Sequence, residues 1–248
     1  MSNNKRIVGI IPARGGSKGL PGKNIKSING KPLINWTIDT ANRSKLLDYF
    51  FVSTDDEDIK KVALKYGAKV IDRPKKLAQD DTSTFDVIKH HLDTNDFDDC
   101  DLIILLEPTS PLRTINDIDN SIKKLIDNYD KPDSLVSVGK IHMENPYITK
   151  VIKHGVVTDF IHSDEKITQR QQLDDVYFPY GVVYLSKIDS YLEHKTFYQD
   201  RTLPYYIERW QNYEIDDVYD HLVVERLLSL WVSYQEDLWK SKNFTEKK

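Results

Sequence analysis

Segments with the pattern of buried strands alternate with segments with the pattern of amphipathic helices along the first 139 residues. The expected strands are 6–12, 48–54, 68–72, 101–107 and 134–139, and the expected helices are 32–43, 56–66, 84–92 and 116–129. Short apolar runs separated by helical patterns are typical of parallel strands that are buried on both faces. The alternation predicts an α/β fold with a Rossmann-like, mostly parallel sheet and helices on both faces. The segment 101–107 is the most apolar, so we expect it near the centre of the sheet.

The pattern changes after residue 139. No helical period is seen in 140–179, where the segments 147–153 and 156–161 alternate in the manner of a β-ribbon with one wet face. We expect an inserted β-rich lobe at 140–179 and one α/β domain made of 1–139 and 180–248. In that domain, 180–185 returns to the sheet, 217–239 forms a long helix and 240–248 is a polar, frayed tail.

Composition excludes several classes of protein. The 248 residues are 39% apolar and 30% charged, which is the balance of a globular protein. A net charge of −4 does not fit general nucleic-acid binding. The one cysteine, Cys100, excludes an internal disulfide and a cysteine-based zinc cluster. The longest aliphatic run, 102–106, is too short to cross a membrane, and residues 1–6 lack the features of a signal peptide, so we expect a cytoplasmic protein.

A glycine-rich loop follows the first expected strand. Four of the ten glycines in the chain lie between Gly15 and Gly22, and the loop also carries the cations Arg14, Lys18 and Lys23. Closely spaced glycines expose backbone N–H groups and let an anion approach, and the cations can neutralise phosphates. Ligands of open α/β sheets bind beyond the carboxyl ends of the strands. The loop therefore predicts a phosphate-binding site there, although a flexible loop with solvated charges is the alternative.

Three other motifs are excluded by their context. A Walker loop would need glycine at Ser17 and serine or threonine at Asn24, and the dinucleotide fingerprint would need a Gly-x-Gly that this loop lacks. Residues 15–19 match the Gly-x-Ser-x-Gly of serine hydrolases. That motif must turn directly into a helix, whereas Pro21 and Gly22 predict a long loop.

Five motifs in order give the chain a more specific resemblance. They are 11–19 (IPARGGSKG), 73–84 (RP, LAQD and TST), 106–113 (LEPTSPLR), 170–181 (RQQL and PYG) and 214–216 (EID). Together they resemble the acylneuraminate cytidylyltransferases, that is, the CMP-sialic acid synthetases and their legionaminic and pseudaminic acid relatives. The resemblance covers nearly the whole chain.

The resemblance implies an activity. Such enzymes activate a nonulosonic acid with CTP and Mg²⁺: the anomeric hydroxyl attacks the α-phosphate and pyrophosphate leaves. The resemblance also implies a homodimer in which the inserted lobe reaches the partner's site, with neither nucleic acid nor membrane as a partner. Two alternatives stay open, namely the same reaction on the eight-carbon acid Kdo or an amino analogue, and a catalytically inactive CTP-binding module.

The resemblance also implies roles for individual residues. Catalytic roles fall to Arg14, Lys23 and Asp216. CTP would be bound by Arg14, Gly15, Ser17, Lys18, Lys23, Asn24, Arg73, Ser83 and Thr84. The sugar acid would be bound by Glu107, Thr109, Ser110, Tyr180, Gly181 and, from the partner subunit, Arg170. Mg²⁺ would be bound by Glu214 and Asp216.

Residue chemistry supports part of this assignment. Glu214 and Asp216 are two apart, so in an extended segment both carboxylates point to one face, where they suit Mg²⁺ that also holds phosphates. Residues 82–84 are equally explained as a helix N-cap.

The sequence departs from the family pattern at three positions. Glu107 stands where glutamine is usual, Tyr180 where asparagine is usual, and Glu214 where aspartate is frequent. The first two changes leave the identity of the sugar acid open, and the third affects the geometry of the metal site.

Overall fold

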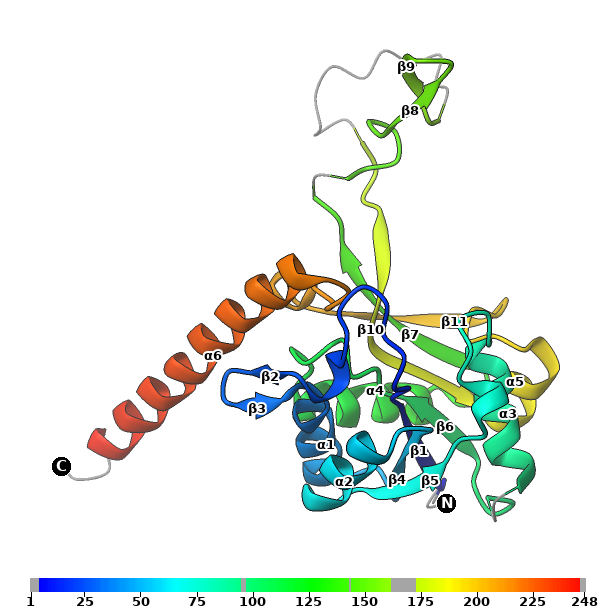
Figure 1. The fold of residues 1–248 in the computed structure, drawn as a ribbon, viewed down its shortest axis with the longest axis vertical. Helices are drawn as coiled ribbons and strands as arrows, with labels where there is room; N and C mark the ends of the chain where they lie inside the picture. Colours follow the sequence, from blue (N-terminus) through cyan, green and yellow to red (C-terminus); the bar gives the residue numbers. More distant parts are fainter. Residues whose placement is uncertain (1–4, 95–96, 143, 162–172, 246–248) are drawn as a thin grey trace.

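A seven-stranded sheet forms the centre of the computed structural model, which describes residues 5–94, 97–142, 144–161 and 173–245 (Figure 1). The strand order is β11-β7-β10-β6-β1-β4-β5. The strands are β1 (Ile7–Pro12), β4 (Tyr49–Thr54), β5 (Lys69–Asp72), β6 (Leu102–Leu105), β7 (Ser134–Lys140), β10 (Tyr177–Lys187) and β11 (Thr202–Tyr206). The strand expected at 101–107 is therefore the central one, as predicted.

Most strand pairs in the sheet are parallel. β1 pairs in parallel with β4 and β6, β4 with β5, and β7 with β11. β10 is antiparallel to both of its neighbours, β6 and β7. The predicted mostly parallel α/β sheet is confirmed, and its reversed strand is β10.

Helices cover both faces of the sheet, as predicted. Helices α1 (Leu33–Arg43), α2 (Glu57–Lys65) and α4 (Ile115–Asp127) pack on one face, and α3 (Thr84–Thr94) and α5 (Ile188–His194) pack on the other. Side chains of β1 alternate between the two cores, with Ile7 and Ile11 in the first and Val8 and Ile10 in the second. The central strands β1 and β6 therefore bury both of their faces, which explains their continuous apolar runs.

Side-chain caps define where two of the helices begin. The Asp56 carboxylate accepts hydrogen bonds from the backbone N–H groups of Asp58 and Ile59, both at 2.9 Å, and starts α2. Thr114 and Asp117 form a capping box at the start of α4. Such caps satisfy N–H groups that have no partner within the helix.

The glycine-rich loop after β1 does not turn directly into an α-helix. It leads into a 3-10 turn, η1 (Lys23–Ile25), and a short hairpin of β2 (Ser27–Ile28) and β3 (Lys31–Pro32), and only then into α1. Gly22 has a φ of +66° at the start of η1, a conformation that favours glycine. The loop therefore lacks the strand-to-helix turn that a serine hydrolase requires.

Two parts of the chain extend beyond the sheet (Figure 1). A ribbon of β8 (Lys150–Lys153) and β9 (Val156–Asp159) forms a separate antiparallel sheet at the end of β7 and β10. Its apolar side chains are open to solvent, with Ile152 73% and Phe160 64% exposed. Helix α6 (Val218–Thr245) projects to the left in Figure 1, in a different direction from the ribbon. Within the described residues, no helix has the length and apolarity needed to cross a membrane.

Three features of the fold differ from the sequence-based expectation. Helix α5 and the edge strand β11 were not predicted. The segment of β11, TLPYY, is short, contains a proline and is only half-buried, as edge strands often are. The tail expected from residue 240 is helical as far as Thr245, because α6 continues through it.

Candidate active site

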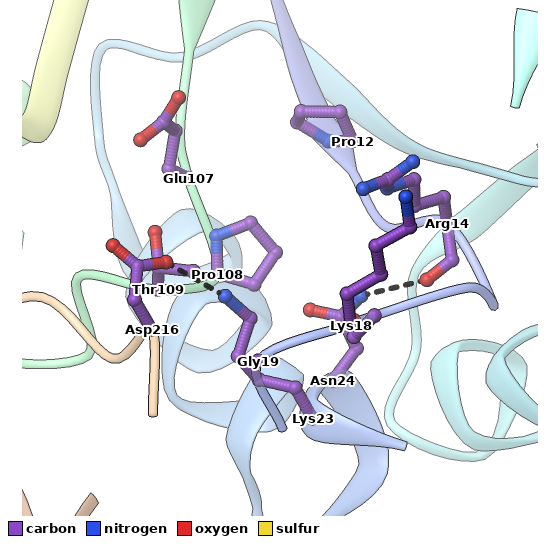
Figure 2. Close-up of a pocket in the computed structure, with 11 residues that line it drawn as sticks. Pro12, Arg14, Lys18, Gly19, Lys23, Asn24, Glu107, Pro108, Thr109 and Asp216 are labelled. Atoms are coloured by element: carbon purple, nitrogen blue, oxygen red, sulfur yellow. Dashed lines mark hydrogen bonds and ion pairs between the residues drawn. The ribbon is translucent and has the colours of Figure 1, made fainter. Parts of the chain in front are cut away.

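A cavity of about 450 Å³ lies where β1 and β6 end, at the carboxyl edge of the parallel strands (Figure 2). We call it the loop cavity, and it is lined by Pro12, Arg14, Ser17, Lys18, Gly19, Lys23, Asn24, Glu107, Pro108, Thr109 and Asp216. The glycine-rich loop, the end of β6 and the segment before α6 thus meet at one site. None of these lining residues is a histidine, so Ser17 has no histidine base beside it in this cavity.

Lysine 23 joins the glycine-rich loop to the acidic segment. Its Nζ donates to the carbonyl oxygen of Ile215 at 2.8 Å and to Asp216 Oδ1 at 3.0 Å. Asn24 holds the loop in shape, because its Nδ2 donates to the carbonyl oxygen of Arg14 at 3.1 Å. Figure 2 shows Arg14 and Lys18 on one side of the cavity and Glu107 and Asp216 on the other, with the Lys23 amine near Asp216. The site therefore has a cationic side and an anionic side.

One aspartate, Asp80, pairs with two of the three loop cations that the sequence analysis singled out. Arg14 Nη1 lies 2.8 Å from Asp80 Oδ1, and Lys18 also pairs with Asp80. These bonds hold the pKa of Asp80 below its ordinary value. Sequence reasoning gave Asp80 no role. Its position within the LAQD motif was the available signal.

A second cavity, of about 270 Å³, adjoins the first, and Pro12 and Arg14 line both. We call it the Arg73 cavity, and its other lining residues are Arg73, Leu77, Gln79, Asp80, Thr82, Thr84, Val87 and Ile88. Arg73 and Thr84, two of the residues predicted to bind CTP, therefore line this cavity. Ser83 lines neither cavity and caps α3, where its hydroxyl accepts from the backbone N–H of Asp86 at 3.0 Å.

The acidic side of the site is held by short contacts around Gly181. Glu214 accepts hydrogen bonds from the Ser110 hydroxyl at 3.0 Å and from the backbone N–H of Gly181. A Cβ atom at residue 181 would lie 2.2 Å from Glu107 Oε2 and 2.7 Å from Glu214 Oε1. A side chain at residue 181 would therefore displace the ends of these two glutamate side chains.

Glutamate 107 has no hydrogen-bond or ion-pair partner for its carboxyl group within the described residues. Burial, and next the charge of Glu214, raise the pKa of Glu107 to about 7, and burial also raises the pKa of Glu214. Asp216, in contrast, is exposed and bonded to Lys23. The two carboxylates of the acidic motif are thus placed differently: Glu214 lies under Gly181 and Asp216 at the opening of the loop cavity.

Arginine 113 was missed as a structural support of the site, although it lies in the LEPTSPLR motif. Its buried guanidinium donates to the backbone carbonyls of Glu107 (2.9 Å), Gly181 (2.7 Å) and Val182, and to the Thr37 hydroxyl (3.0 Å). Arg113 therefore ties the end of β6 to β10. Its N–H groups bind backbone oxygens and leave the Glu107 carboxyl group without an ion pair.

The remaining expected sugar-site residues lie close to this region, with one outside the described residues. Thr109 lines the loop cavity, and Tyr180 is half-buried and packs edge-on against Phe178 with ring centres 5.0 Å apart. A register shift between Pro179 and Tyr184 displaces this part of β10 from the regular ladder. Arg170 lies outside the described residues.

The residues present fit a magnesium ion that takes part of its ligands from a substrate. Within the described residues, no group of three or more histidine, cysteine, aspartate or glutamate side chains could hold a metal ion by itself. Asp216 lines the loop cavity and supplies one carboxylate there, whereas Glu214 is not among the residues that line the cavity and accepts from Ser110 and Gly181. Mg²⁺ is often held by one or two carboxylates, with phosphates and water as its other ligands.

The fold and the site define an α/β protein with a glycine-rich, cation-bearing loop at the carboxyl edge of its sheet. The family model described as Cytidylyltransferase matches residues 8–242, and the chain belongs to this family.

Two relatives of known name illustrate the range of the family. The chain is 33% identical to the CMP-N,N'-diacetyllegionaminic acid synthase of Legionella pneumophila, over 91% of this chain and 97% of that protein. It is 34% identical to an N-acylneuraminate cytidylyltransferase of Streptococcus agalactiae over 86% of this chain. The chain spans about half the length of that enzyme, 52% of it.

A solved structure supports the fold. The CMP:2-keto-3-deoxy-manno-octonic acid synthetase complexed with CTP superposes with a TM-score of 0.68 at 18% identity, covering 91% of this chain and 99% of that one. At this identity the similarity concerns the fold.

Proposed function

We propose that the protein transfers CMP from CTP to the anomeric hydroxyl of a nonulosonic acid of the sialic or legionaminic acid type, and that pyrophosphate is released. One observation carries this proposal: a loop cavity with cations on one side and carboxylates on the other shares the lining residues Pro12 and Arg14 with the Arg73 cavity. A triphosphate needs the cations, and the neighbouring cavity offers room for its nucleoside. The names of the relatives support CTP and a nonulosonic acid as the reactants.

The loop cavity is our proposed triphosphate site. The cations Arg14, Lys18 and Lys23 neutralise the phosphates. The backbone N–H of Gly15 donates to Asp55 Oδ1 at 3.1 Å and that of Ser17 donates to the Gly15 carbonyl oxygen at 3.1 Å, so phosphate oxygens would have to replace these acceptors. Asn24 keeps the loop in shape through its bond to Arg14. Charge neutralisation and positioning are the main requirements of such a transfer, because the nucleophile and the leaving group are supplied by the substrates.

The Arg73 cavity is our proposed cytosine site. A guanidinium has five N–H groups, and two of those on Arg73 are donated to Ser53. The others can donate to the adjacent acceptors O2 and N3 of cytosine, whereas uracil carries a hydrogen on N3. Donors directed at this edge therefore favour CTP over UTP. Thr84 lines the same cavity, while Ser83 contributes indirectly by capping α3, the helix that carries Thr84.

The acidic segment is our proposed metal site, with Glu214 and Asp216 holding Mg²⁺. The ion, when bound, withdraws charge from the phosphates that it contacts. Lys23, which is bonded to Asp216, keeps the acidic segment against the loop.

The sugar acid is proposed to lie against Glu107, Thr109, Ser110, Tyr180 and Gly181, with Arg170 contributed by the partner subunit of a homodimer. In this proposal, 1–139 and 180–248 form the nucleotidyltransferase domain and 140–179 form the dimerisation lobe. The exposed apolar side chains of the β8–β9 ribbon support such an interface.

Pyrophosphate release tests the proposed function. The protein is supplied with CTP and Mg²⁺, and with N-acetylneuraminic acid, N,N'-diacetyllegionaminic acid, a pseudaminic acid or Kdo. We expect release with a nine-carbon acid and none without a sugar acid. Release with Kdo alone would replace the nine-carbon substrate class by the eight-carbon one. CTP binding without release from any acid would instead indicate an inactive CTP-binding module.

A further inference from the structure

Three buried side chains form a continuous hydrogen-bonded network behind the Arg73 cavity. Arg73 Nε donates to Ser53 Oγ at 3.0 Å, and Arg73 Nη2 donates to the Ser53 carbonyl oxygen at 2.9 Å. Ser53 Oγ lies 2.6 Å from His91 Nε2. All three are inaccessible, with exposed fractions of 7% for Arg73, 0% for Ser53 and 1% for His91. The network joins β5, β4 and α3, three elements that are distant in sequence.

The direction of these hydrogen bonds follows from charge. Burial, and next the positive charges of His90 and Arg73, lower the pKa of His91 to about 4, so its imidazole is neutral. A neutral Nε2 that carries no hydrogen can accept a hydrogen bond from the hydroxyl that it faces. With the ring hydrogen of His91 on Nδ1, which is the tautomer that we assign, Ser53 donates to Nε2 and uses a lone pair to accept from Arg73. In this arrangement the hydroxyl proton points away from the guanidinium, which a cationic partner requires.

No salt bridge in the described part of the chain includes Arg73, although Asp55 is near enough to raise its pKa. Burial outweighs that effect and lowers the pKa of Arg73 to about 10, still far above neutral pH. The guanidinium is thus a buried cation held by Ser53 through a neutral hydroxyl and a carbonyl. The same carbonyl also accepts from the backbone N–H of Ala13 at 2.9 Å, so it is fixed by the loop after β1. Of the two acceptors that hold Arg73, only the Ser53 hydroxyl can therefore be removed by a side-chain substitution.

We propose that His91, acting through Ser53, is a positioning residue that orients the Arg73 guanidinium in its cavity and so sets the preference for CTP over UTP. This inference rests on the proposed function, in which Arg73 contacts the cytosine. His91 itself touches no substrate. It fixes the rotation of the Ser53 hydroxyl, and the hydroxyl together with the carbonyl fixes the plane of the guanidinium. A guanidinium free to tilt would lose the alignment of its remaining N–H groups with the base.

Binding of CTP and of UTP, measured by calorimetry in the presence of Mg²⁺ and without a sugar acid, tests the proposal. The variants are Ser53→Ala, which removes the hydroxyl, His91→Leu, which removes the acceptor, and His91→Gln, which keeps one. We expect the Kd of CTP to rise roughly tenfold in Ser53→Ala and His91→Leu, the scale of one hydrogen bond to a charged group. The Kd of UTP should change less, so the ratio of the two dissociation constants should move toward one. The dissociation constants of His91→Gln should be closer to those of the wild type.

Ser121→Ala is the matched control. Ser121 is also fully buried, but its hydroxyl donates to the Ile118 carbonyl within α4, so its loss should leave both dissociation constants unchanged. Thermal melting shows which variants are folded, and Ser53→Ala alone decides the matter if His91→Leu does not fold. A purely structural network would lower the melting temperature without changing the CTP-to-UTP ratio.

The outcomes separate this inference from the proposed function. If Arg73→Lys weakens CTP binding while folded Ser53→Ala and His91→Leu retain the wild-type affinities and ratio, the positioning role is refuted and the cytosine site stands. If the wild-type protein binds no CTP, both the site and the positioning role are refuted.

Discussion

Among the residues of the loop cavity, Glu107 shows how surroundings change the pKa of a carboxyl group. Glutamine at this position would have been a neutral amide. Glutamate instead brings a second acid next to Glu214, and the backbone carbonyls bonded to Arg113 leave no cation free to pair with it. The result is a proton that is taken up near neutral pH.

Glu107 should make the stability of the metal-free protein fall as pH rises. Its pKa is about 7 in the folded chain and near 4.5 when unfolded, so the folded state binds more protons between these values. The contribution is present below pH 4.5 and is lost as pH passes through 7. Glu107→Gln removes the group whose ionisation destabilises the fold at high pH. At pH 8 in EDTA we expect this substitution to raise the free energy of unfolding by at most about 3 kcal/mol.

Urea unfolding of the wild type and of Glu107→Gln at pH 5 and pH 8 measures the difference in their free energies of unfolding. We expect this difference to be smaller at pH 5 than at pH 8. The control is Glu193→Gln, which removes a solvent-exposed carboxyl on α5. Equal effects of Glu107→Gln at both pH values would contradict a pKa near 7.

At the level of elements, the site depends on a junction beneath it, where α4, β11 and the 3-10 turn η4 (Arg209–Gln211) meet at Asp117. The Asp117 carboxylate accepts from the Thr114 N–H at 2.7 Å, from Gln211 Nε2 at 2.7 Å and from the Tyr205 hydroxyl at 3.0 Å. One carboxylate therefore completes the cap of a helix and also anchors the segment that leads to Glu214.

Asp117→Ala should lower the free energy of unfolding by about 3 kcal/mol, because it removes a helix cap and leaves buried donors without an acceptor. Tyr205→Phe, which removes one of these bonds, should lower it by about 1 kcal/mol. Urea unfolding measures both. A loss of under 1 kcal/mol for Asp117→Ala would show that Asp117 acts only as an ordinary cap.

At the scale of the whole molecule, the projecting ribbon carries apolar side chains that no other described part of the chain covers. Apolar side chains are exposed to solvent on β8 (Ile152), on β9 (Val157) and at Phe160, which directly follows β9. Exposed apolar patches of this kind mark interaction surfaces. The proposed homodimer would cover them with a second copy of the chain.

We expect the wild-type protein to have a mass of about twice 28.9 kDa in solution, by light scattering after gel filtration. The double variant Val157→Asp and Phe160→Asp should be monomeric, because burying two carboxylates in an apolar interface is costly. Leu64→Asp on α2 is the control, since Leu64 is also exposed, at 55%, but lies away from the ribbon. A double variant that remains dimeric would exclude the ribbon as the interface.

Much of the fold could be predicted from local sequence patterns. The apolar run of β6 indicated its central place, and the alternation of strands and helices indicated the mostly parallel sheet. The antiparallel direction of β10 could not be predicted, because strand direction depends on how the chain returns from the inserted lobe. The edge strand β11 lacks the apolar run that marks a buried strand.

The sequence by itself determined the kinds of groups in the site: a glycine-rich loop with cations, an arginine after β5 and two acids before α6. These follow from motifs, because loop chemistry is local and their order along the chain is readable. Only the tertiary structure decided which of these groups face one another. It brought Lys23 to Asp216, paired Arg14 and Lys18 with Asp80, and placed His91 behind Arg73. The physical reason is that these contacts join residues from separate elements, so they exist only once the sheet has aligned the carboxyl ends of its strands.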